Sequence, residues 1–260
     1  TEGTTMERFI IGTQLAQAAG VRHALERART RWPKSTGALY YKLNDNCSAA
    51  SWATVDWYGV PKISHYLIQD SFAPLAAVVL FPKAGTYGEP LQVPVFLLDD
   101  ADVLNDSAWE VIVRAFGANL ELIQEKRFPG NGTISSVLRL GEFALTAAQT
   151  QTAPLLVVTD VMQAGTLMKR NYYFTNFEPV KDCLFNLPKT ILSIQIGENQ
   201  VNVRNEGSLP AVGVNISCPG HLDTFIAEDN YFWLDPGETM KVAVSTTDRI
   251  EVRAWNSPAR

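Results

Sequence analysis

The sequence has 260 residues, of which 46% are hydrophobic and 19% are charged, and its formal net charge is −5. This length and hydrophobic content can bury the core of one large domain or of two smaller ones, which excludes a disordered chain and a small disulfide scaffold. An acidic chain offers no basic surface to neutralise phosphates, so we expect no nucleic acid partner. The longest apolar run, Leu75 to Phe81, is far shorter than the roughly 20 residues that span a bilayer, so we expect no membrane partner.

The cellular compartment stays open. Three cysteines, Cys47, Cys183 and Cys218, permit at most one disulfide, which does not decide between a reducing and an oxidising environment. Asn-x-Ser/Thr sequons are glycosylation sites only in a secretory pathway, and chance accounts for them equally well. These sequons begin at Asn46, Asn105, Asn131 and Asn215.

The N-terminal third of the chain has a helix–strand–helix pattern. Apolar residues recur every three or four positions from Ile11 to Ala28, which predicts a helix over residues 5–30 that Pro33 ends. Ala38 to Leu43 is a nearly continuous apolar run, so we expect a strand that is buried on both faces inside an α/β layer. After an aromatic-rich loop, Pro61 suits the first turn of a second helix, on which Tyr66 belongs to an apolar stripe.

From Ala73 onward the hydrophobic period changes to two, the period of half-buried strands. Clusters of Gly, Pro, Asn and Asp separate these runs, and no long helical pattern lies between them, which favours antiparallel sandwiches. A passage with two prolines, residues 178–188, divides the strands into two sets. The expected strands are 91–97, 109–115, 122–128, 134–140, 154–158 and 167–174, then 191–196, 200–204, 211–217, 231–234, 240–245 and 250–255.

The predicted fold class is mainly β, with a partial (β/α)8 barrel end followed by two immunoglobulin-like β-sandwich domains. One buried strand between two helices cannot form an α/β domain alone, because its faces and edges need further strands and helices. A whole TIM barrel takes about 250 residues, so residues 1–72 are interpreted as only its C-terminal end. The sandwiches are expected at 73–177 and 178–260.

One stretch of the sequence resembles a known family. It contains Gly37 to Asp45 (GALYYKLND), Ser51-Trp52, and Asp56 to Lys62 (DWYGVPK). This stretch is similar to the region of the last barrel strand in the β-mannosidases of glycoside hydrolase family 2. Looser similarities to barrel helices 7 and 8 and to the terminal sandwich of that family lie at Thr13–Ala18, Tyr66–Pro74, Cys218–His221, Asp229–Phe232 and Leu234–Gly237.

The resemblance implies the C-terminal part of a retaining exo-glycosidase that removes terminal β-linked mannose. In that family two glutamates after earlier barrel strands act as acid/base and nucleophile, about 5 Å apart. No glutamate of this chain lies at a matching strand end, so we assign no catalytic residue and expect the isolated chain to be inactive although the parent protein is an enzyme. The implied partners are a terminal β-mannoside or oligosaccharide and the missing N-terminal part of the same protein.

Four residues are candidates for the substrate pocket, because residues after a barrel strand face the active site. Asn44 and Asp45 suit hydrogen bonds to sugar hydroxyls, Trp52 suits stacking on a pyranose ring, and Cys47 is a small residue facing the pocket. The alternative is that Asp45 caps a turn and Trp52 packs under the loop. The family usually has an aromatic residue followed by Pro where this chain has Cys47 and Ser48, which leaves the shape of the sugar subsite open.

The sequence predicts no metal, no cofactor and no cysteine nucleophile. The histidines His23, His65 and His221 lack metal-binding spacing, and retaining glycosidases use carboxylates. Two alternative functions remain. One is a non-catalytic carbohydrate- or protein-interaction β-sandwich module. The other is the same portion of an exo-glycosidase with a different sugar specificity: glucosaminidase, galactosidase or glucuronidase.

Overall fold

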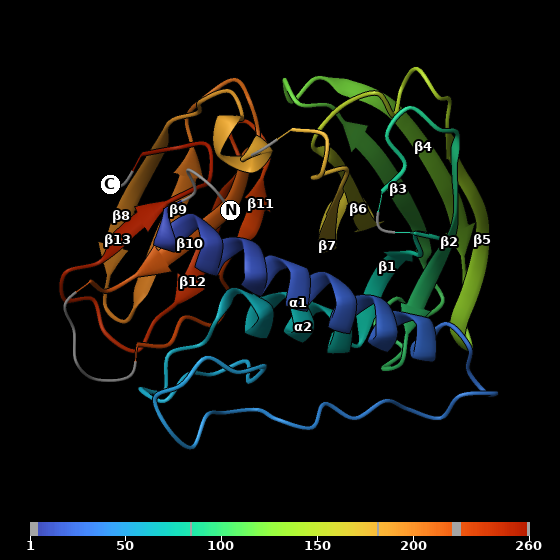
Figure 1. The fold of residues 1–260 in the computed structure, drawn as a ribbon. Helices are drawn as coiled ribbons and strands as arrows, with labels where there is room; N and C mark the ends of the chain where they lie inside the picture. Colours follow the sequence, from blue (N-terminus) through green and yellow to red (C-terminus); the bar gives the residue numbers. More distant parts are fainter. Residues whose placement is uncertain (1–4, 84, 181, 220–224, 259–260) are drawn as a thin grey trace. The chain divides into compact units, whose positions relative to one another are not determined.

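The structure is a computed structural model and describes residues 5–83, 85–180, 182–219 and 225–258. Within these residues the chain forms two α-helices, α1 (Met6–Arg29) and α2 (Ile63–Phe72), a short 3-10 helix η1 (Cys183–Asn186), and strands joined by loops (Figure 1). Both α-helices lie where the hydrophobic periodicity predicts them. The chain divides into two units, one of residues 1–20, 39–68 and 184–260 and the other of residues 21–38 and 69–183.

The unit that contains residues 69–183 is built on two antiparallel sheets. One sheet has the strand order β1-β2-β5 and the other has the order β4-β3-β6-β7. Neighbouring strands keep long registers, as between β3 and β6, where Val111 lies opposite Val161. The strands are β1 (Leu75–Val79), β2 (Leu91–Asp99), β3 (Ala108–Phe116), β4 (Leu122–Asn131), β5 (Ser136–Leu145), β6 (Leu155–Gln163) and β7 (Thr166–Thr175).

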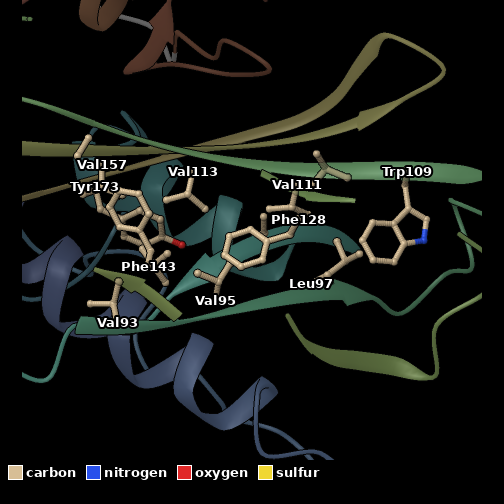
Figure 2. Close-up of a cluster of buried hydrophobic side chains, with 14 of the residues drawn as sticks. Val93, Val95, Leu97, Trp109, Val111, Val113, Phe128, Phe143, Val157 and Tyr173 are labelled. Atoms are coloured by element: carbon tan, nitrogen blue, oxygen red, sulfur yellow. The ribbon is translucent and has the colours of Figure 1, made fainter. Parts of the chain in front are cut away.

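Side chains from both of these sheets meet in one buried core. Val95 and Leu97 from β2 and Val111 and Val113 from β3 are all 0% exposed, and they belong to the same cluster as Phe143 from β5. Figure 2 shows them between the two sheets, with aromatic rings filling the middle of the core. Burying each such side chain contributes about 1.5 to 3 kcal/mol. The alternation predicted from the sequence therefore gives a β-sandwich, in which alternate positions of each strand face the core.

Helix α1 adds a buried charged pair to this unit. Arg22 Nε donates to Glu26 Oε1 at 2.7 Å, one helical turn away, and the two residues are only 4% and 1% exposed. The Tyr173 hydroxyl donates to the same carboxylate at 3.1 Å, and the Arg22 guanidinium lies 4.0 Å from the centre of the Tyr173 ring. Because the partners come from α1 and β7, this network fixes the last turns of α1 against the sheet.

The unit that contains residues 184–260 holds a second β-sandwich. Its sheets have the orders β11-β10-β13 and β12-β9-β8. Val201 and Val203 from β9 face a core that also includes Val214, Ile216 and Leu234 from the other sheet. The strands are β8 (Leu192–Gly197), β9 (Gln200–Asn205), β10 (Ala211–Ser217), β11 (Phe232–Leu234), β12 (Thr239–Ala243) and β13 (Glu251–Arg253).

Strand β1 is the element that sequence periodicity missed. The run from Leu75 to Val79 is buried at all five positions, so it shows no polar and apolar alternation. One of its faces, with Ala77, joins the main core, while the other, with Val78, packs against Leu98 in a small separate cluster. A strand that is covered on both sides cannot be recognised by a period of two.

The structure corrects the prediction of a strand at residues 38–43. The described chain has neither helix nor strand there, and Leu39 and Tyr41 are 99% and 91% exposed. Leu43 is 59% exposed, whereas Ala38, Tyr40 and Lys42 are partly buried. The prediction of a buried strand is therefore wrong for this chain, because no strand among the described residues pairs with this segment or covers its apolar side chains.

Within the residues that the structure describes, no helix is long and apolar enough to cross a membrane. Part of the similarity noted at Cys218–His221 lies outside the described residues, and His221 is among the residues left out.

Candidate functional site

The loop from residue 43 to residue 62 is organised by backbone hydrogen bonds next to Asn44. The Leu43 carbonyl accepts hydrogen bonds from the N–H groups of Thr54 at 3.0 Å and Val55 at 2.8 Å. Asn44 then forms a parallel bridge with Val55, which in turn forms an antiparallel bridge with Pro61. The four candidate residues therefore lie on one loop whose two arms are joined at this point.

Asp45 is the buried centre of this loop. It is 4% exposed, and its carboxylate lies 3.2 Å from the ammonium group of Lys42 and 3.2 Å from that of Lys62. The Ser51 hydroxyl donates to Asp45 Oδ1 and accepts a hydrogen bond from the Ala53 N–H at 3.0 Å. One carboxylate thus contacts Lys42 just before the loop, Ser51 in its middle and Lys62 at its end.

These contacts favour the ionised form of Asp45. The hydrogen bond from Ser51, together with the Lys62 and Lys42 ammonium groups, lowers the pKa of the Asp45 carboxyl from 3.8 to about 2. Asp45 is therefore an anion at neutral pH and accepts hydrogen bonds only. Its oxygens already have three protein donors, so its geometry suits fixing the loop and orienting Lys42 and Lys62.

Trp52 presents its ring at the surface of the same loop. The side chain is 65% exposed, and the Lys42 ammonium group lies 5.7 Å from the ring centre. The backbone carbonyl of Trp52 accepts hydrogen bonds from the Gln17 amide and from the Tyr40 hydroxyl, while Gln17 also donates to Tyr40 at 3.0 Å. The main chain is therefore held by α1, and the ring remains open to a ligand.

Asn44 and Cys47 are both exposed. The Asn44 amide donates to the Asp45 carbonyl at 3.2 Å, so its carbonyl oxygen stays available as an acceptor. Cys47 follows Asp45 in the part of the loop that leads to Ser51. Among the described residues, no three His, Cys, Asp or Glu side chains form a group that could hold a metal ion.

Sequence reasoning missed three residues that organise this site: Lys42, Lys62 and Gln17. Lys42 lies three residues before Asp45, and Lys62 ends the DWYGVPK motif, so both stood within the stretch of family resemblance. Only the spatial structure brings their charges to one carboxylate. Gln17 is a helix residue whose contact with Trp52 joins positions 35 residues apart, which no local pattern indicates.

Comparisons with known proteins agree with the sequence resemblance. No protein-family model matches the chain. A β-mannosidase of Rattus norvegicus is 50% identical over 42 residues, which are 16% of this chain and 5% of that protein. The exo-chitosanase of Amycolatopsis orientalis matches 99% of this chain with a TM-score of 0.77 and 16% identity. A β-D-mannosidase from Dictyoglomus thermophilum matches 99% of this chain with a TM-score of 0.73 and 18% identity.

The resemblance to β-mannosidase-type exo-glycosidases is confirmed. The two solved enzymes share the fold of nearly the whole chain, and their low identity limits that match to the fold. This chain spans 35% of the length of the exo-chitosanase and 31% of that of the mannosidase. The chain is mainly β, with its sheets antiparallel throughout the described residues.

Proposed function

We propose that this chain is the C-terminal portion of a retaining exo-acting glycosidase that releases terminal β-linked mannose. Residues 1–72 close a catalytic (β/α)8 barrel, and residues 73–177 and 178–260 form two accessory immunoglobulin-like β-sandwiches. The two catalytic glutamates belong to the missing N-terminal part of the same protein, about 5 Å apart as double displacement requires. The chain supplies one wall of the active site.

The observation that carries this proposal is the alternating exposure of residues 38–43. Leu39, Tyr41 and Leu43 are exposed at 99%, 91% and 59%, whereas the Tyr40 hydroxyl between them is hydrogen bonded to Gln17 of α1. In a barrel, alternate side chains of a strand face the outer helices and the packed interior. Three large apolar side chains on the side away from α1 are what a barrel interior takes up, and water does not favour their exposure.

The loop that follows this segment supports a role in binding sugar. Residues at the C-terminal end of a barrel strand line the active site, and Asn44, Asp45, Cys47 and Trp52 follow the segment directly. The exposed Trp52 ring offers a flat apolar face to a pyranose, and the Asn44 amide offers hydrogen bonds to hydroxyls. Asp45 acts as a positioning residue, because its carboxylate holds Lys42, Ser51 and Lys62.

Mannose is the proposed sugar, and glucosamine is the second candidate. The rat β-mannosidase that is 50% identical over 42 residues favours mannose, since its match is one of sequence. The exo-chitosanase, which is also an exo-β-D-glucosaminidase, makes glucosamine the second candidate because it shares the fold, and its TM-scores of 0.72 to 0.77 overlap the 0.73 of the mannosidase. The 50% identity carries more weight because related folds often serve different substrates.

A chromogenic assay tests the proposal. The longer parent protein is expected to hydrolyse an aryl β-mannoside faster than an aryl β-glucosaminide, and the 260-residue chain alone is expected to hydrolyse neither. Retention of the β-configuration in the first product, followed by NMR, identifies double displacement. Robust turnover by the chain alone would refute the assignment of both carboxylates to the missing part, and faster turnover of the glucosaminide would replace mannose by glucosamine.

A further inference from the structure

The outer face of one sheet of the C-terminal sandwich carries a polar depression of about 260 Å³. In β8 and β9, Val201 and Val203 face the core with Ile194, so the residues between them point away from it. On β12, Met240 packs against the core and its neighbour Thr239 points outward. The lining residues are Ser193, Gln195, Asn202, Arg204, Glu206 and Thr239.

Part of this lining is held in place by its own contacts. Arg204 Nε lies 3.1 Å from Glu206 Oε1, and Arg204 Nη1 donates to the Thr239 hydroxyl at 3.3 Å. The Ser193 hydroxyl donates to the same oxygen of Glu206 at 2.8 Å. The guanidinium and the carboxylate are therefore oriented before any ligand arrives, and both side chains remain almost half exposed, at 49% and 45%.

Two amides complete the lining. Gln195 on β8 lies directly opposite Asn202 on β9 in the strand register. Among the described residues, neither side-chain amide has a hydrogen bond partner, so both can serve a ligand with a donor and an acceptor. Directly opposite residues on one face have Cβ atoms about 5 Å apart, which brings the two amides within reach of one small molecule.

We propose that this depression binds one neutral sugar unit of a glycan chain. All six lining residues carry polar groups and none is aromatic, so the depression offers a ligand several hydrogen bonds beside the aliphatic carbons of the same side chains. Arg204 and Glu206 balance each other in charge, which favours a polyhydroxylated neutral ligand over an anion. The volume is below the ~300 Å³ of the smallest usual ligand pockets, so it fits a single monosaccharide unit.

This inference goes beyond the proposed function, because the depression lies on β8, β9 and β12 and uses none of the candidate residues on the 43–62 loop. It adds a second contact with the glycan, at which the ligand is bound but not cleaved. Binding through a few solvent-exposed hydrogen bonds is weak, and its value lies in raising the local concentration of the substrate when the enzyme also holds the glycan elsewhere.

Titration of the 260-residue chain with β-1,4-linked mannobiose, followed by backbone amide NMR, tests the proposal. The amide chemical shifts of the six lining residues are expected to change saturably, with a Kd in the millimolar range. Asn202→Ala is expected to weaken binding about tenfold, since it removes hydrogen bonds to the ligand. Gln200→Ala is the matched control, because Gln200 is also a partly buried amide on the outer face of β9 but does not line the depression. The backbone spectrum of each variant reports whether its fold is intact.

The following results would contradict the proposed sugar-binding depression. No saturable shift overturns the proposal, as does an equal effect of Asn202→Ala and Gln200→Ala. Inorganic phosphate that binds more tightly than mannobiose would make the depression an anion site instead. Trp52→Ala is expected to leave these shifts unchanged, so that failure here is separable from failure of the proposed function. Shifts confined to residues 44–62 would overturn this site and leave the proposed function standing.

Discussion

The carboxylate of Asp45 lies 3.2 Å from the ammonium group of Lys62, which stands 17 residues further along the chain. Lys62 also donates to the Ser51 carbonyl at 3.4 Å, and its own N–H donates to the Thr54 carbonyl at 2.8 Å. The ion pair therefore joins the start of the loop to the beginning of α2. Trp52, whose ring is 65% exposed, lies between these two points of the chain.

Asp45→Asn is expected to destabilise the chain at neutral pH and to change its response to acid. The pKa of Asp45 is lowered from 3.8 to about 2 in the folded chain, so ionisation stabilises the fold above pH 3.8, and this stabilisation is lost as the pH falls through 2. The difference in urea midpoint between the wild type and Asp45→Asn should be largest at neutral pH and should shrink between about pH 4 and pH 2. A difference that is constant with pH would contradict this ion-pair account.

Trp52→Ala is expected to lower kcat/KM of the parent protein for an aryl β-mannoside about 10- to 100-fold, since loss of one stacking ring costs about 1.5 to 3 kcal/mol of transition-state binding. Trp32→Ala is the matched control, because Trp32 is 50% exposed and lies outside the loop. Steady-state kinetics of both variants provide the measurement. Equal and small effects would make Trp52 a structural residue.

Arg22→Met is expected to destabilise the sandwich unit by about 3 to 5 kcal/mol, because it leaves the buried carboxylate of Glu26 without its cation. The double variant Arg22→Met with Glu26→Leu should recover much of this loss, since it removes the buried charge as well. Urea unfolding of the two variants measures the difference. Arg253→Ala removes an exposed partner of Glu7 and serves as a control that should cost less than ~1 kcal/mol.

Leu39→Asp is expected to affect the 260-residue chain and the longer parent protein differently. Leu39 is 99% exposed here, so the substitution should change the stability of the 260-residue chain by less than ~0.5 kcal/mol. In the parent the same aspartate would be an unpaired charge inside the barrel, so activity and soluble yield should fall sharply. Leu122→Asp, at a position that is 52% exposed on β4, is the control expected to be tolerated in both proteins.

Hydrophobic periodicity predicted most of the fold because most elements have one covered face. Both helices and several strands show this periodicity, as in β2, where Val93, Val95 and Leu97 are buried in turn. β6 and β10 are buried at nearly every position, and the sequence displays them as apolar runs bounded by turn residues. Strand β1 is also buried at every position and shows no alternation, and it was not predicted. The segment at 38–43 has the composition of a buried strand, but composition does not reveal whether the neighbours that would bury it belong to the same chain.

The candidate site was predictable only in part. Family resemblance led to Asp45 and Trp52, because both lie in the short stretch of sequence that carries the resemblance. The roles of Lys42 and Lys62 depend on both reaching one carboxylate, and the support from Gln17 depends on the approach of α1 to the Trp52 carbonyl. Contacts of this kind are set by tertiary structure and leave no periodic signal in the sequence.

Amide hydrogen exchange at residues 38–43 tests most directly whether this segment completes a barrel. In the part of the chain that the structure describes, the N–H groups of these residues donate no hydrogen bond, so they should exchange rapidly in the 260-residue chain. In the parent protein, strands on both sides should pair with them and slow their exchange by orders of magnitude. Equally fast exchange in both proteins would contradict the barrel interpretation.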